Sequence, residues 1–98
     1  SVTSERIDKY LSLTAKALKK VSIIDEPGSV NHSKAEDILG MVNAYYSDAK
    51  YFLDEGRGDD AFAAINYAHG WLDSGARISL FKVTDDRLFT VDSDRVFD

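Results

Sequence analysis

Four polar residues in the second half of the chain carry side chains that could act together. Their three- and four-residue spacings place them on one stripe of a helix: Asn66, His69, Asp73 and Arg77. An aspartate four residues from a histidine can fix the imidazole tautomer and make the ring a better base. An arginine four residues further on can form an ion pair with that aspartate. The stripe is therefore a candidate for small-ligand binding or catalysis.

The stripe lacks the nucleophile that would complete a catalytic triad. The nearest hydroxyl group belongs to Ser74, which lies about 100° round a helix from Asp73. Similar ladders of polar residues are common on helix surfaces, where they have no chemical role. We therefore assign no catalytic residue, and a non-enzymatic protein is the favoured interpretation.

The sequence predicts neither a metal site nor a cofactor. It contains no cysteine, so thiolate ligands and a cysteine nucleophile are excluded. Its two histidines, His32 and His69, fall in different predicted segments, without the spacing of a helical metal site. The pair Gly56 and Gly58 follows no predicted strand and lacks the third glycine of a phosphate-binding loop.

A second candidate site is a strip of small residues beside aromatic ones. A glycine inside a helix costs about 1 kcal/mol relative to alanine. Gly75 is directed towards the predicted core, where it would let helices approach closely, whereas Gly70 is directed outwards. The candidate interface comprises Ala63, Tyr67, Gly70, Trp71 and Ser74. Close packing is expected there, by a second subunit or by residues 82–98.

Three amphipathic helices must position these residues. Apolar side chains recur every three or four residues over 4–24, 33–55 and 59–81. Ser33 and Glu36 match a capping box at the start of the second helix. The short link between the second and third helices forces them to pack as an antiparallel hairpin. The prediction is an all-α, up-down-up three-helix bundle.

Residues 82–98 depart from the helical period. The sequence Asp86-Arg87-Leu88-Phe89 recurs eight residues later as Asp94-Arg95-Val96-Phe97. Alternation over residues 87–91 is typical of a short strand. We expect a helical domain over residues 1–81, followed by an extended C-terminal tail or a short hairpin over residues 82–98.

Length and charge restrict the partners. The 98 residues fit one domain, and the formal net charge is −5. Residues 4–22 carry five basic and two acidic side chains, and acidic residues dominate the rest. Nucleic acid is therefore not the expected partner, because its binding needs a strongly basic surface. The longest apolar run, Ala61–Ile65, is too short to span a membrane. We expect a cytoplasmic protein that binds another protein or a second copy of itself as a homodimer.

Two stretches carry a family resemblance: Tyr45–Leu53, which reads YYSDAKYFL, and Ala61–Phe81, which reads AFAAINYAHGWLDSGARISLF. With Gly56 between them, they resemble a family of short archaeal proteins catalogued as domain of unknown function number 357. The resemblance covers essentially the whole chain and is most specific in Tyr67–Gly75. It implies a small helical archaeal protein. That family has no assigned activity, so the resemblance implies no catalytic or binding residue.

Overall fold

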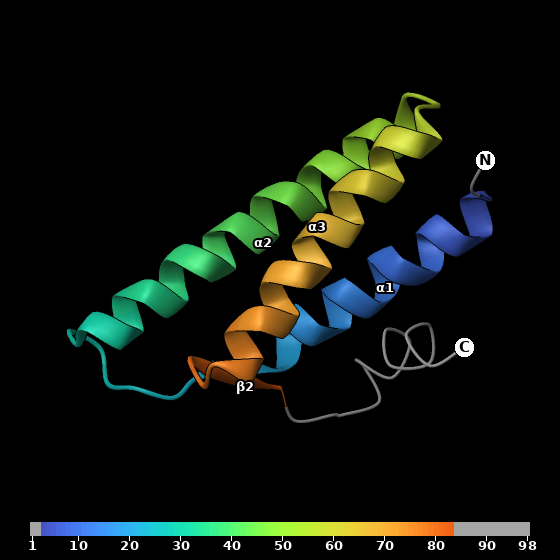
Figure 1. The fold of residues 1–98 in the computed structure, drawn as a ribbon. Coiled ribbons are helices and arrows are strands. Elements are labelled where there is room, and N and C mark those ends of the chain that lie inside the picture. Colours follow the sequence, from blue (N-terminus) through green and yellow to red (C-terminus); the bar gives the residue numbers. More distant parts are fainter. Residues whose placement is uncertain (1–2, 84–98) are drawn as a thin grey trace.

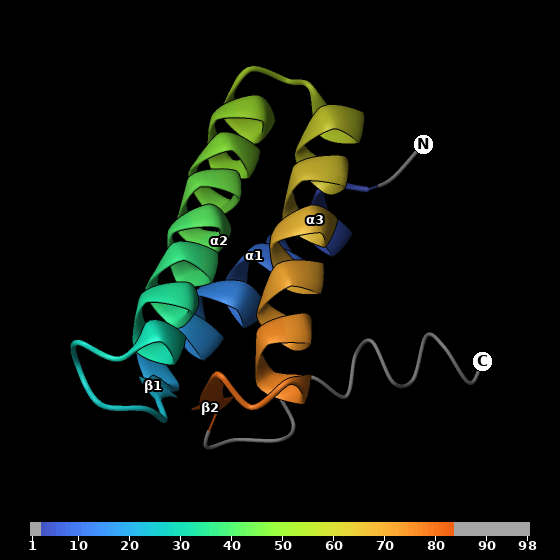
Figure 2. The same ribbon diagram turned by 60° about the vertical axis from the view of Figure 1, so that its left-hand side comes forward.

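A computed structural model of the chain describes residues 3–83. This part consists of α1 (Ser4–Lys20), β1 (Val21–Ile23), α2 (Val30–Asp54), α3 (Gly58–Arg77) and β2 (Phe81–Val83). Helices α2 and α3 lie side by side as an antiparallel hairpin, and α1 packs across one side of it (Figure 1, Figure 2). The predicted all-α, three-helix up-down-up bundle is confirmed.

Small residues form the seam between α2 and α3. The buried residues of α2 are Ala35, Val42 and Ala49. On α3, the small buried residues Ala61 and Ala68 share the same seven-residue spacing. Seven residues make almost two turns, so each set forms one stripe along its helix. Small side chains let the two backbones approach closely, and the larger apolar residues of α2 consequently stay only partly buried.

One face of α1 completes the core. Its buried residues are Ile7, Tyr10, Leu11, Thr14 and Ala17. The Tyr10 ring packs edge-on against Phe62, with ring centroids 5.8 Å apart, and against His69 at 6.4 Å. Edge-to-face contacts are a favoured geometry for such rings, so Tyr10 fixes how α1 sits against α3.

The first and third helices end earlier than predicted. Helix α1 ends at Lys20 rather than 24, and α3 ends at Arg77 rather than 81. The residues that follow each helix form β1 and β2, which pair antiparallel with Val21 opposite Val83. Ser79 has a φ of 63°, which ends the helical path before β2. The apolar residues here extend the helical period, but pairing between distant segments overrides it.

The second helix begins earlier than predicted. Its N-cap is Ser29, whose hydroxyl oxygen accepts a hydrogen bond from the His32 backbone N–H at 3.0 Å. The expected capping box at Ser33 is therefore wrong, and Glu36 instead approaches His32, with Oε1 3.4 Å from Nδ1. Gly28, with a φ of 93°, turns the chain just before the cap.

The expected domain boundary after residue 81 falls inside β2, which runs Phe81–Val83. The strand expected over 87–91 and the hairpin expected within 82–98 lie outside the described residues, apart from the first two positions of that range.

Candidate functional site

The four residues of the predicted polar stripe do not form one cluster. Arg77 Nε donates to Asp73 Oδ2 at 2.9 Å, with the arginine side chain exposed to solvent. Asn66 Nδ2 donates to the Phe62 carbonyl oxygen at 3.0 Å. His69 is only 2% exposed and lies edge-on to Tyr10 between α1 and α3. The structure thus pairs Asp73 with Arg77. The His69 side chain is instead buried where α1 packs against α3.

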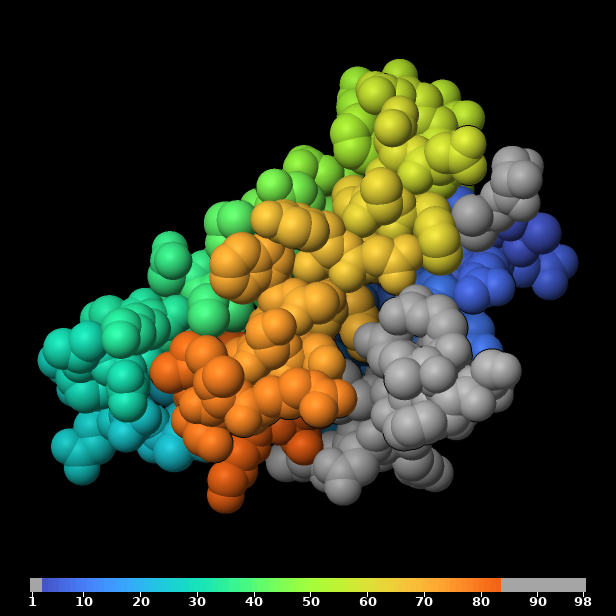
Figure 3. Space-filling model, in the orientation of Figure 1, coloured from blue at the N-terminus to red at the C-terminus, as the bar shows by residue number. Residues whose placement is uncertain are grey.

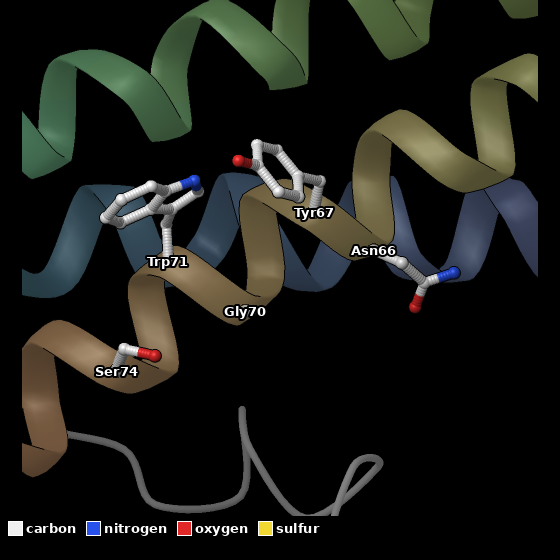
Figure 4. Close-up of a pocket in the computed structure, with 5 residues that line it drawn as sticks. All are labelled: Asn66, Tyr67, Gly70, Trp71 and Ser74. Atoms are coloured by element: carbon white, nitrogen blue, oxygen red, sulfur yellow. The ribbon is translucent and has the colours of Figure 1, made fainter.

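The predicted interface residues form a surface that we call the aromatic face: Ala63, Tyr67, Gly70, Trp71 and Ser74. All of these residues are exposed except Trp71, which is half-buried. A shallow hollow is lined by four of them together with Asn66. The two rings lie on the α2 side of the bare backbone at Gly70 (Figure 4). Figure 3 shows the α3 side chains (yellow to orange) at the surface beside those of α2 (green).

The rings of the aromatic face are held in place by contacts with each other and with α2. The Tyr67 ring lies 4.6 Å from the ring of Tyr45, with an interplanar angle of 73°. It also meets Trp71 edge-on at 6.1 Å. The nitrogen-bearing edge of the Trp71 indole faces Tyr67 (Figure 4). These contacts orient both rings before anything binds, so a partner would order few further side chains.

The two glycines of α3 beyond its first turn have different surroundings. A Cβ atom added at Gly75 would overlap the ring of Phe81, so this glycine makes room for β2. The expectation that Gly75 lets two helices approach is thus replaced by a helix–strand contact. At Gly70, an added Cβ would meet no atom within 4 Å. The small size of Gly70 therefore has no explanation among its contacts within residues 3–83.

Gly40 of α2 provides a reference for Gly70. A Cβ atom added there also meets nothing within 4 Å. Its helix neighbours Glu36, Asp37 and Asn43 are exposed polar residues, and no exposed aromatic ring lies three or four residues away. Gly70 differs because Tyr67 stands one turn before it and the hollow lies over it.

The aromatic face carries no charged residue, although the chain has a net charge of −5. Within residues 3–83, no three His, Asp or Glu side chains are placed to hold a metal ion. In the same part of the chain, none of the helices is both long and apolar enough to cross a membrane.

Tyr45 was not among the predicted site residues, although the sequence contains a signal for it. Tyr45 and Tyr67 lie equally far in sequence from Gly56, which sits in the link between α2 and α3. An antiparallel hairpin brings residues at equal distances from its turn to the same level. Asn66, in turn, lines the hollow next to the aromatic face.

Comparison with known proteins identifies a family without an assigned function. The chain matches the family described as "Protein of unknown function (DUF357)" over residues 9–81. No curated protein and no solved structure shows significant similarity to it. The match spans α1 from its second turn, both helices of the hairpin and the first residue of β2. Because it covers well over half of the sequence, the chain belongs to the DUF357 family.

Proposed function

We propose that this protein is a non-enzymatic self-association module in which two copies meet through the aromatic face. The observation that carries the proposal is the hollow over Gly70 beside two rings that are already held in place. Tyr67 is 50% exposed, although it belongs to a packed cluster of three rings. Exposed aromatic side chains beside small residues are typical of protein interfaces.

The shape of the aromatic face favours a second copy as the partner. A two-fold dimer requires a surface that is complementary to itself. Here the half-exposed ring of Tyr67 borders a recess at Gly70 and Ser74. In a two-fold arrangement, this ring of each copy lies over the recess of the other, so both recesses are filled by the same contact.

The charge distribution also favours a second copy. Two copies of a chain with a charge of −5 repel each other over most of their surface. The aromatic face has no ionisable group of its own apart from the Tyr67 phenol, and it offers a place where two copies can meet without opposing like charges. The Asp73–Arg77 ion pair at its edge is internally balanced.

The alternative role of the polar stripe is less well supported. Ligand binding or catalysis there would need His69 to be accessible beside Asp73. The structure buries His69 and pairs Asp73 with Arg77. The archaeal source and the cytoplasmic location expected from the sequence are part of the proposal and rest on the family resemblance and on composition.

Sedimentation velocity over a range of concentrations tests the proposal. We expect the native chain to sediment increasingly as a dimer as its concentration rises. Gly70→Lys should stay monomeric, because the new side chain fills the recess and places a charge on each copy. Gly40→Lys is the matched control, because it makes the same substitution at an equally open glycine of α2. It should behave like the native chain.

Circular dichroism of each variant checks that the bundle is intact. A native chain that is monomeric at every concentration would overturn the proposal. So would equal dimerisation of all three proteins.

A further inference from the structure

Helix α1 carries a continuous basic stripe on the side next to α3. The stripe comprises Arg6, Lys9, Leu13, Lys16 and Lys20, at alternating spacings of three and four residues. Its four cationic residues are exposed and its leucine is half-buried. The guanidinium carbon of Arg6 lies 5.9 Å from the ring centroid of Tyr10 and 5.8 Å from that of Phe62. These contacts place the stripe along the junction of α1 and α3.

The middle of the basic stripe has no carboxylate partner within the described part of the chain. Between residues in 3–83, a histidine–carboxylate contact lies on α2, and ion pairs lie at the start of α3 and at its end. None of them involves Lys9 or Lys16. Four cationic side chains on one stripe repel one another, and the repulsion is relieved when an anionic segment lies over them.

Residues 84–98 have the composition that complements this stripe. They contain five aspartates and two arginines, a formal charge of −3. They also contain two copies of the pattern Asp-Arg-aliphatic-Phe, at 86–89 and 94–97. Each copy joins a carboxylate to a large apolar side chain. The basic stripe offers a partner for both groups: its cations can bind the carboxylate, and the half-buried side chains of Leu13 and Phe62 can contact the apolar side chain.

The fold also delivers this segment to the correct end of α1. Strand β2 ends at Val83, which pairs with Val21, the first residue after α1. The described part of the chain therefore ends beside the end of α1 that carries Lys20, where β2 pairs with β1 (Figure 1). Helix α1 has 17 residues and is about 26 Å long. Fifteen residues reach up to about 50 Å when extended, so the segment can cover the whole stripe.

We propose that residues 84–98 bind along the basic stripe of α1 in the same chain, with their aspartates on its cations. Phe62, beside the stripe, and Trp71, on the aromatic face, lie about 180° apart round α3. The two surfaces are therefore separate, and this inference is independent of the proposed dimer. The bound segment offsets most of the positive charge of the basic stripe and competes there with external polyanions.

Paramagnetic relaxation enhancement tests this contact in the full chain. The native chain has no cysteine, so Ser93→Cys provides one attachment site for a nitroxide label. We expect loss of amide signal between Lys9 and Lys16 of α1, and none around Gly40 of α2. Raising the salt concentration to 1 M should restore the α1 signals, because the Debye length then falls to about 3 Å.

Two charge variants and a mixing experiment complete the test. Lys9→Glu with Lys16→Glu should abolish the signal loss in α1. Lys34→Glu with Lys50→Glu, which makes the same charge change at exposed sites of α2, should preserve it. Undiminished α1 signals in the labelled native sequence would overturn the proposal, as would losses centred on Trp71. Signal loss in an isotope-labelled chain mixed with a separate nitroxide-labelled chain would also overturn it, because the segment would then bind a second copy.

Discussion

Gly70 and Gly75 lie on the same helix, yet they face opposite kinds of surroundings. Each imposes the same penalty of about 1 kcal/mol on α3 relative to alanine. The penalty at Gly75 is offset within the chain, because the ring of Phe81 occupies the space a side chain would need. At Gly70 the space is open and the neighbouring ring of Tyr67 is exposed. The comparison separates a glycine that the fold requires from one that the fold leaves unexplained.

The largest expected effect concerns the contact between Gly75 and Phe81. Phe81 is only 1% exposed, so Phe81→Ala should reduce the free energy of unfolding by about 3–5 kcal/mol. Gly75→Ala should reduce it by about 1–3 kcal/mol, because the added methyl group overpacks the same site. Urea denaturation of both variants measures these changes.

The double variant shows whether the two effects share one cause. With Phe81 already replaced by alanine, Gly75→Ala should be neutral or should stabilise the helix by up to about 1 kcal/mol. If Gly75→Ala costs the same free energy in both backgrounds, the ring of Phe81 is not the reason for the glycine.

A smaller effect of opposite sign is expected at Gly70. Gly70→Ala should raise the stability of the isolated chain by about 0.5–1 kcal/mol, because a methyl group fits there and favours the helix. The same methyl group narrows the recess, so dimerisation should weaken. Thermal unfolding of dilute protein measures the first effect, and sedimentation of concentrated protein measures the second. A variant that is less stable as a monomer would show that Gly70 already has a packing role within the chain.

The sequence predicts the helices well because apolar periodicity dominates them, but it misplaces their ends. Residues 21–23 continue the apolar pattern of α1, and only pairing with 81–83 turns them into strand. Such pairing joins segments that lie far apart in the sequence, which a local pattern cannot reveal. The cap of α2 was misplaced for a different reason. Ser29, rather than the expected Ser33, caps the helix because the turn at Gly28 comes directly before it.

The sequence directs Gly70 to the outside of α3, and Gly70 is exposed there, because helical geometry alone fixes its direction. It missed the role of Tyr45, which depends on how two helices are aligned. It also treated His69 as part of a polar stripe. Helical spacing puts His69 at the edge of that stripe, but only the position of α1 decides that the ring is buried.

The most direct test of the central claim is an isotope-filtered nuclear Overhauser experiment on an equal mixture of labelled and unlabelled chains. It detects only contacts between protons of different copies. The account predicts cross-peaks from the ring protons of Tyr67 and Trp71 in one copy to the Gly70 α-protons and the Ser74 side chain in the other. The absence of intermolecular cross-peaks in concentrated protein, or cross-peaks confined to another surface, would contradict it.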